Sequence, residues 1–286
     1  MSKRLQRRNS DQRHTLRIER NNTERPIELV QITDSHLGGQ PGEELLGMDT
    51  DQSLAHVIDL IEAERPSAEL LLATGDISNG GSPASYLRFQ QLTGHLAPHI
   101  LWLPGNHDAL PAMQQTFAGD PALGRNIEVG NWQIIMLNSA TPGEVGGNFS
   151  AGELEFLQHC LETTEAEHVL LCMHHHPIPI GCDWLDGQQV RNADAFFALV
   201  DQFSSVRGIL WGHIHQELDQ QRNSVSLMAT PSSCIQFAAN SPDFKLARLN
   251  PGYRWLSLHA DGAIDTGISR VTGVEFDIDY EHSSGY

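Results

Sequence analysis

Short apolar runs alternate with segments of helical periodicity along most of the chain. The run at 27–33 precedes a segment at 51–65, in which Leu54, Val57, Ile58 and Ile61 keep the i, i+3, i+4, i+7 spacing of an amphipathic helix. The same pattern predicts strands at 69–73, 99–103, 132–139, 168–173 and 207–211, and helices at 83–96, 152–162 and 192–203. After residue 223 it predicts further strands in SVSLMA, SCIQFA, YRWLSLHA and AIDTGISRV, with a hairpin turn at 260–262. The expected fold class is α/β, a two-sheet αββα sandwich with helices outside.

A residue type that binds metals follows five of the predicted strands. The five segments are Asp34-Ser35-His36, Gly75-Asp76, Gly105-Asn106-His107-Asp108, His174-His175-His176-Pro177 and Gly212-His213-Ile214-His215. Because the carboxyl ends of parallel strands meet at one edge of a sheet, these side chains are expected to gather there. The sequence therefore predicts a metal centre.

The spacing and the chemistry of these residues narrow the type of centre. In an extended chain, residues i and i+2 point the same way, so Asp34 can face one ion with His36, and His213 can do so with His215. Carboxylates and imidazoles without thiolates suit manganese, iron, zinc or cobalt. The five segments offer seven protein ligands: Asp34, His36, Asp76, Asn106, one of the histidines at 174–176, His213 and His215. Seven exceed the three or so of a single catalytic ion, whereas two ions roughly 3.5–4 Å apart can share a bridging carboxylate. Asp76 is the candidate for that bridge.

The motifs D-x-H, G-D, G-N-H-D, H-x-P and G-H-x-H, in this order between Ile27 and His215, resemble those of the calcineurin-like metallophosphoesterases. The segments LPGNHDALPAM, HHHPIPIGCDWLD, GHIHQELD, ATPSSCIQF and LNPGYRWLSLHADG further resemble the bacterial class III 3′,5′-cyclic-AMP phosphodiesterases. The resemblance implies a sandwich of the metallophosphoesterase type and hydrolysis of 3′,5′-cyclic AMP to 5′-AMP. The motif spacing alone does not separate this substrate from a glycerophosphodiester, a 2′,3′-cyclic nucleotide or another small phosphate ester. A non-catalytic binding module is a third reading, but it would be expected to lack some ligands, and every motif position here is filled.

The resemblance also assigns the ligands of two ions, with iron and manganese as first candidates and zinc or cobalt as alternatives. It implies that the first ion is held by Asp34, His36, Asp76 and His215, and the second by Asp76, Asn106, His175 and His213. Among the three consecutive histidines, His175 is expected to be the ligand because it lies two residues before Pro177, and because strand alternation would turn both neighbours away.

The resemblance implies that a hydroxide bridging the two ions attacks phosphorus in line. Such a hydroxide can form near neutral pH, since even one zinc lowers the pKa of its water to about 7. His107 is expected to stabilise the phosphoryl oxygens and to assist departure of the ribose oxygen, with Asp108 orienting it. Asn106 and His107 are expected to contact the substrate, and Trp184 to stack on its base.

Composition and charge set the domain organisation. With 286 residues, 40% of them hydrophobic, one domain at 26–274 is expected, preceded by a basic disordered extension at 1–25 and followed by an acidic tail at 275–286. The extension has eight Lys/Arg against three Asp/Glu, a charge of +5. Because the whole chain carries −18, residues 26–286 carry −23. This acidic body favours a small-molecule substrate and no nucleic-acid or membrane partner; the oligomeric state stays open, with a homodimer as one option. Apolar stretches far shorter than the roughly 20 residues of a membrane span predict a cytoplasmic location. Cysteines without C-x-x-C spacing predict reduced thiols.

Overall fold

The protein was analysed as a computed structural model, which describes residues 15–20 and 24–282. Two β-sheets pack face to face, with helices on both outer sides. The larger sheet has seven strands in the order β1 (Thr15–Ile18), β7 (Asn126–Val129), β8 (Trp132–Met136), β9 (His168–Cys172), β10 (Val206–Trp211), β12 (Val225–Ala229) and β11 (Leu218–Arg222). The smaller sheet has five, in the order β14 (Ile264–Arg270), β13 (Gly252–Leu258), β2 (Ile27–Ile32), β5 (Leu70–Thr74) and β6 (His99–Leu103). The predicted two-sheet sandwich is therefore confirmed.

Each sheet contains a run of neighbouring parallel strands. β2, β5 and β6 are parallel in the smaller sheet, and β8, β9, β10 and β12 in the larger one. β13 pairs antiparallel with β2 and with β14, as the predicted hairpin requires. A small separate hairpin joins β3 (Glu44–Leu45) to β4 (Met48–Asp49) through Leu46 and Gly47, both at positive φ. Parallel order brings the carboxyl ends of several strands of each sheet to a common edge.

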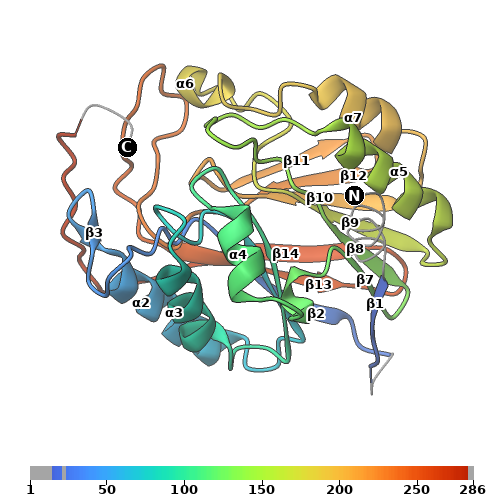
Figure 1. The fold of residues 1–286 in the computed structure, drawn as a ribbon, viewed down its shortest axis with the longest axis horizontal. Coiled ribbons are helices and arrows are strands. Elements are labelled where there is room, and N and C mark those ends of the chain that lie inside the picture. The colour runs from blue at the N-terminus through green and yellow to red at the C-terminus, as the bar shows by residue number, and fades with distance from the viewer. Residues whose placement is uncertain (1–14, 21–23, 283–286) are drawn as a thin grey trace, which may run out of the picture.

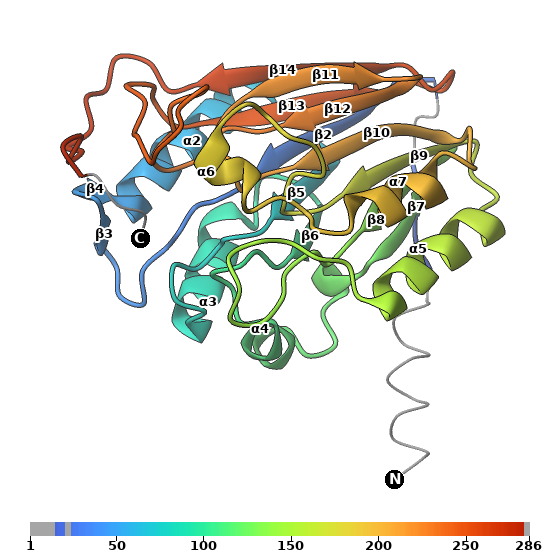
Figure 2. The ribbon, with the colours of Figure 1, turned by 90° about the horizontal axis from the view of Figure 1, so that it is seen from above.

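The helices cover the outer faces of the sheets. α2 (Thr50–Glu64), α3 (Pro83–Thr93) and α4 (Leu110–Thr116) lie on one side of the strands, and α5 (Ala151–Thr163) and α7 (Ala193–Val200) lie on the other (Figure 1). Two single turns, η1 (Pro121–Leu123) and α6 (Asp183–Asp186), complete the set. Side chains cap several helices at their start, and Asp49 and Ser150 each accept a hydrogen bond from the backbone N–H three residues later. Figure 2 shows the same layers from above.

The core divides into three layers because alternate residues of each strand face opposite sides. In β2, Leu29 joins the cluster between the sheets, whereas Val30 joins the cluster under α2 and α3. In β9, Leu170 faces the other sheet, and Leu171 faces α5 and α7. Strands buried on both faces explain the continuous apolar runs such as LLLAT.

Two sequence-based expectations about elements need correction. SCIQFA is not a strand, because only an isolated bridge joins Phe237 to Leu246. The segment 1–25 is not disordered throughout, since Thr15–Ile18 forms β1, parallel to β7, and the Arg20 guanidinium bonds the Glu69 carboxylate at 2.7 and 2.8 Å. Residues 1–14 and 21–23 lie outside the described residues. The remaining predicted ranges agree with the observed elements to within a few residues, while α4, β7 and β11 were not predicted.

The acidic C-terminal segment packs on the domain as far as it is described. The Asp279 N–H donates to the Leu46 carbonyl at 2.8 Å, and the Arg248 guanidinium lies 4.0 Å from the centre of the Tyr280 ring. Residues 275–282 are therefore a packed strap and not a loose tail, while 283–286 lie outside the described part. Among residues 15–20 and 24–282, no helix combines the length and apolar character needed to cross a membrane. All four cysteines are buried and unpaired, as predicted.

Candidate metal centre

The five predicted segments follow the carboxyl ends of five strands and meet at one edge of the sandwich. β2, β5 and β6 of one sheet lead into the loops of Asp34, Asp76 and Asn106, while β9 and β10 of the other lead into those of His174–His176 and His213–His215. Backbone hydrogen bonds join neighbouring loops. Asp34 N–H donates to the Gly75 carbonyl at 3.0 Å, and Gly212 N–H donates to the His174 carbonyl at 3.1 Å. The loops therefore form one connected rim.

The backbone at this rim is left-handed at five of the predicted ligands. The φ angles are 54° at Asp34, 46° at His36, 48° at Asp76, 65° at His213 and 48° at His215. These make up five of the eight positive-φ residues other than glycine in the described chain. Side-chain-bearing residues rarely adopt this conformation, and such strain concentrates at functional sites. The expectation that Asp34 and His36 share a face because the chain is extended was wrong in its reason, since both lie beyond the strand in left-handed turns.

One group of side chains surrounds a first ion position. Ligand atoms of Asp34, His36 and His215 all lie within 4.8 Å of one another, and all three residues are buried. His215 Nε2 is 3.3 Å from both His36 Nε2 and Asp34 Oδ1. Asp76 Oδ2 lies 3.8 Å from His36 Nε2, so Asp76 borders the same position.

A second group lies on the other side of Asp76. His174 Nε2 is 3.2 Å from Asp76 Oδ2 and 3.2 Å from Asn106 Oδ1. His213 joins this side, because a ring nitrogen of it lies within 4.8 Å of ring nitrogens of His174 and His175. Asp76 thus lies between the two groups, where a bridging ligand would be, and His213 and His215 face different positions.

The three consecutive histidines have different surroundings. His174 Nδ1 lies 2.8 Å from the Thr74 carbonyl, which directs Nε2 toward Asp76 and Asn106. Both ring nitrogens of His175 already have partners, with Nδ1 2.8 Å from Ser139 Oγ and Nε2 3.0 Å from the Val145 carbonyl. His176 is buried, and its ring stacks on that of His213 with 5.8 Å between centroids. β9 ends at Cys172, so strand alternation does not govern these residues. The geometry favours His174 as the ligand, although the sequence favours His175.

His107 and Asp108 lie beside the ions' positions but are held differently from expectation. His107 N–H donates to Asp76 Oδ1 at 2.8 Å, and its ring Nδ1 lies 3.0 Å from the Asn79 carbonyl. The Asp108 carboxylate accepts backbone N–H bonds from Gly105 at 2.9 Å, Ser78 at 3.0 Å and Ile77 at 3.3 Å. Asp108 therefore ties two loops together, and the Asn79 carbonyl has the orienting role that was expected of Asp108.

Two glycines let the loops approach this closely. A Cβ at Gly105 would overlap the Asp76 carboxylate and would lie 2.6 Å from the Asp76 nitrogen. A Cβ at Gly75 would overlap the His174 ring, and this glycine is also left-handed, with φ of 97°. The glycines before Asp76 and Asn106 are therefore required by packing around the ligands.

Burial and mutual proximity set the charge state of the site. Burial, helped by neighbouring histidines, lowers the pKa of His36 and of His175 to about 3 each, and that of His213 well below its usual value. Burial would lower the pKa of His174 too, but the carboxylates of Asp76 and Asp34 outweigh it and raise this pKa to about 9. Burial would likewise raise the pKa of Asp76, yet the nearby histidines hold it well below its usual range. The site therefore presents neutral imidazoles at His36 and His213, the protonation state of metal ligands, whereas His174 holds a proton that a bound metal ion would have to displace.

The donor set fits two metal ions. All the candidate donors are imidazole nitrogens or carboxylate and amide oxygens, and Asp76 Oδ2 lies between them, 3.8 Å from His36 Nε2 and 3.2 Å from His174 Nε2. The Nε2 atom of His213 is buried and has no hydrogen-bond partner among the described residues. Buried polar atoms are normally paired, and a cation is the partner that an imidazole nitrogen among other ligands can take.

A cavity of about 210 Å³ opens beside these ligands. The predicted substrate-contacting residues Asn106, His107 and Trp184 all line it. Its lining also includes Val145, Gln188, Phe237 and Phe244, which the sequence analysis did not single out. Phe237 was assigned to a strand, and Val145 is an apolar residue within a Gly- and Pro-containing loop, which is the signal that could have identified it.

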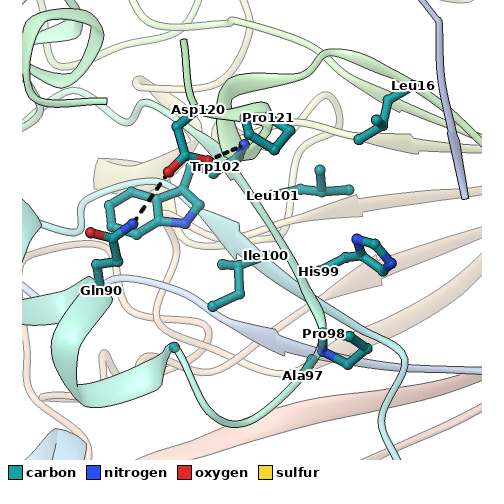
Figure 3. Close-up of a pocket in the computed structure, with 12 residues that line it drawn as sticks. Leu16, Gln90, Ala97, Pro98, His99, Ile100, Leu101, Trp102, Asp120 and Pro121 are labelled. Atoms are coloured by element: carbon teal, nitrogen blue, oxygen red, sulfur yellow. Dashed lines mark hydrogen bonds between the residues drawn. The ribbon is translucent and has the colours of Figure 1, made fainter. Parts of the chain in front are cut away.

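A separate cavity of about 200 Å³ lies at β6 and η1, away from the metal ligands (Figure 3). There Asp120 accepts hydrogen bonds from Ala122 N–H and from the Gln90 side chain. The Asp120 carboxylate is thus engaged in capping η1, and this cavity does not contribute to the metal centre.

Comparison with known proteins agrees with this geometry. Residues 27–217 match the model of the calcineurin-like phosphoesterase family, and the chain belongs to that family. A 3′,5′-cyclic adenosine monophosphate phosphodiesterase CpdA of Pseudomonas aeruginosa is 46% identical over 264 residues, which cover 92% of this chain and 97% of that protein. The protein of the same name from Escherichia coli K12 is 39% identical over 91% of this chain and 95% of its own. A 3′,5′-cyclic-nucleotide phosphodiesterase of Nostoc is 38% identical over 87% and 94%.

Solved structures share the fold at low sequence identity. A dimetal phosphatase from Danio rerio superposes with a TM-score of 0.63 at 14% identity, over 86% of this chain and all of that one. GAP50 of the Plasmodium inner membrane complex gives 0.61 at 12% identity, over 89% of each chain. Identities this low support the fold and nothing finer.

Proposed function

We propose that the protein is a binuclear-metal phosphodiesterase that hydrolyses 3′,5′-cyclic AMP to 5′-AMP. The observation that carries the proposal is the pair of overlapping ligand groups around Asp76, complete at every position and open to a cavity. Two proteins named 3′,5′-cyclic-AMP phosphodiesterase match this chain over nearly their whole length, and they support cyclic AMP as the substrate. A small diester without a nucleotide, such as a glycerophosphodiester, or a 2′,3′-cyclic nucleotide, is the alternative.

The ligands are assigned by proximity. The first ion would be held by Asp34, His36, Asp76 and His215, and the second by Asp76, Asn106, His174 and His213. The oxygen and nitrogen donors suit iron and manganese, with zinc or cobalt as alternatives. Two ions held there would supply Lewis-acid charge to the phosphoryl group and a water made acidic enough to attack phosphorus in line.

The protein's own contribution to the reaction centres on His107. Its Nδ1 faces the Asn79 carbonyl, which can only accept, so the proton resides on Nδ1 and the other ring nitrogen is the one that exchanges protons. The ring lines the cavity, where a protonated imidazole would stabilise the non-bridging oxygens and assist departure of the 3′ oxygen. Asp108 keeps the loop of His107 in place by joining Gly105 to Ile77 and Ser78.

The negative charge of residues 26–286 makes a local positive field from the two ions and His107 necessary. Residues 26–286 carry −23, which would repel an anionic substrate from a distance. The same charge argues for a small substrate and against a nucleic-acid partner. A cytoplasmic location belongs to the proposal, because all four cysteines are unpaired, as is usual in a reducing compartment.

The test is hydrolysis by purified protein stripped of metal and reloaded with iron, manganese or zinc. We expect metal-dependent conversion of 3′,5′-cyclic AMP to 5′-AMP, with a higher kcat/KM than for 2′,3′-cyclic AMP, a glycerophosphodiester or an aryl diester. Asn106→Ala and His213→Ala should each lower activity at least about 100-fold, since even residues that only support a metal ligand cost about 10–100-fold. His95→Ala, at a half-exposed histidine paired with Glu62 outside the site, is the control. Rapid turnover of another ester with negligible cyclic-AMP cleavage would favour the alternative.

A further inference from the structure

The cavity beside the metal ligands has an apolar part that phosphodiester hydrolysis by itself does not require. Its lining away from the ligands comes from three separate segments, which contribute Val145, Trp184 with Gln188, and Phe237 with Phe244. Hydrolysis of a small ester needs only the ions and His107. An aromatic wall next to them indicates that the substrate carries an apolar, planar group.

The aromatic wall is attached rigidly to the metal centre. Phe237 stacks on the ring of His215, with centroids 4.2 Å apart and 11° between the planes. Trp184 packs edge-on against Phe237 at 5.0 Å and against Phe244 at 5.2 Å. The wall therefore begins at a ligand of the first ion, and its distance from the reacting phosphate is fixed by the fold.

Val145 lies in a loop that is fastened to the same region. Its carbonyl lies 3.0 Å from His175 Nε2, and two residues on, the Gly147 N–H donates to the Gln188 carbonyl at 3.1 Å. The side chain is nevertheless 55% exposed, one of three large exposed hydrophobic side chains in the described chain. An apolar side chain held at the edge of a polar site is typical of a ligand contact.

Polar groups in this part of the cavity are few. Apart from the metal ligands and His107, Gln188 is the one lining residue with a polar side-chain amide. No hydrogen bond from that amide occurs within the described residues, and the indole N–H of Trp184 has no partner there either. A planar group bound against the aromatic wall would have the Gln188 amide at its edge, where this amide can donate and accept hydrogen bonds.

We infer that Val145, Trp184 and Phe244 form a subsite for a heteroaromatic base, and that Gln188 is the side chain that distinguishes one purine from another. This inference rests on the proposed function and specifies how its substrate is selected. Stacking accepts any base, because every base has a π-face. Discrimination between adenine and guanine must then come from their edges, which differ in hydrogen-bond donors and acceptors.

The experiment compares substrates with and without a base. The kcat/KM for 3′,5′-cyclic AMP is divided by that for the 3′,5′-cyclic phosphate of 1-O-methyl ribose, which keeps the ester and lacks the base. Stacking of a base contributes about 1–3 kcal/mol, so this ratio should lie between about 5 and 150 for the wild type. We expect Phe244→Ala to lower the ratio about tenfold and Val145→Ala about threefold, mainly through KM. Leu87→Ala, an exposed leucine on α3 outside the cavity, should leave the ratio unchanged.

Two further measurements extend the test. Gln188→Ala should change the ratio of cyclic AMP to cyclic GMP turnover severalfold while the stacking variants change both nucleotides alike. Saturation-transfer NMR with adenosine, which has no phosphate, should detect binding to the wild type and weaker binding to Val145→Ala. Because Val145 is exposed, this variant keeps the inference testable even where Phe244→Ala fails to fold.

The outcomes separate the subsite from the activity. A wild-type ratio near one, or a ratio that neither Phe244→Ala nor Val145→Ala changes, would overturn the base subsite and leave the phosphodiesterase standing. If neither cyclic ester is hydrolysed, the proposed function falls, and the subsite falls with it. An unchanged purine preference in Gln188→Ala would remove Gln188 alone from the inference.

Discussion

Five of the proposed ligands occupy left-handed backbone conformations, which residues other than glycine seldom adopt. A left-handed residue other than glycine costs of order 1–3 kcal/mol, and five such residues gather at this rim. Hydrogen bonds between loops hold the conformation, as where Ser232 Oγ donates to the Asp34 carbonyl at 2.7 Å and His36 N–H donates to that of Asp76 at 2.9 Å. These left-handed turns direct the side chains of Asp34 and His36 into the site from one short loop.

The histidine run provides a prediction at the scale of single residues. Because His174 Nε2 lies 3.2 Å from both Asp76 and Asn106, His174→Ala should remove the second ion and lower activity at least about 100-fold. His175 already bonds Ser139 and the Val145 carbonyl, so His175→Ala should keep both ions and lose activity more mildly. The metal content of each purified variant, measured by elemental analysis, decides between the two. Loss of one ion in His175→Ala with two retained in His174→Ala would restore the assignment made from sequence.

The types and order of the residues in the sequence were enough to predict most members of this candidate site. They were not enough to predict its geometry. Asp34, Asp76, Asn106, His213 and His215 could be identified because metals select few donor types and the donors recur at strand ends. The choice between His174 and His175 could not be made, because it depends on which ring the Thr74 carbonyl orients. Apolar lining residues such as Phe244 carry no chemical signature in a sequence, since a buried phenylalanine and a cavity-lining one look the same.

Strands with a continuous apolar run and helices with clear periodicity were predictable, whereas the two edge strands of the larger sheet were not. Strands such as β5 and β9 are buried on both faces and read as apolar runs, and α2 shows its periodicity directly. β11 has the sequence LDQQR and β1 the sequence TLRI within a charged stretch. Both are outermost in the larger sheet and form through backbone pairing, which hydrophobic patterning does not record.

β1 provides the prediction at the scale of elements. Ile18 is buried among side chains of the layer between the sheets, so Ile18→Ala should lower the free energy of unfolding by about 2 kcal/mol. Arg17, on the same strand, has a 70% exposed side chain, and Arg17→Ala should change stability by less than about 0.5 kcal/mol. Denaturant unfolding of both variants measures the difference. Equal stability of the two would mean that residues 15–18 are not part of the folded sheet in solution.

At the scale of the whole molecule, a buried polar network joins the two sheets behind the metal loops. The Arg254 guanidinium is fully buried and donates from the smaller sheet to the Ala229 carbonyl of the larger one at 2.7 Å. Gln31 crosses the same interface, donating to the Trp211 carbonyl at 3.2 Å and to Thr74 Oγ1 at 2.7 Å. Since four of the proposed ligands follow strands of the smaller sheet and three follow strands of the larger one, these contacts hold the two sets in fixed positions relative to each other.

The buried histidines make the stability of the whole molecule depend on pH. Burial lowers the pKa of His36 and His175 to about 3, that of His176 to about 4, and that of His213 well below its usual value. Below a pH of about 6.5 the unfolded chain binds protons that the folded chain does not, so stability falls as pH falls. Each such group contributes about 1.4 kcal/mol per pH unit in that range.

The shifted pKa values of Asp108 and His174 also affect stability, but they do not cancel the loss that the buried histidines cause at low pH. Burial raises the pKa of Asp108 to about 6, which adds stability as pH falls from 6 toward its usual value and offsets one histidine. The raised pKa of His174, about 9, matters only above neutral pH, where its contribution is lost as pH rises. Between pH 6.5 and 5 the net loss should be on the order of 5 kcal/mol.

Denaturant unfolding at pH 8, 6.5 and 5 tests the dependence, and His176→Leu isolates part of it. His176 is outside the proposed ligand set, and the Asp186 carboxylate lies 3.9 Å from its Nε2, so leucine removes a titrating group together with a long ion contact. The variant should lose about 1.4 kcal/mol per pH unit from the slope between pH 6.5 and 5. Stability that stays level down to pH 5 in the wild type would contradict the neutral state of these histidines, and with it the argument that the fold prepares them to bind metal.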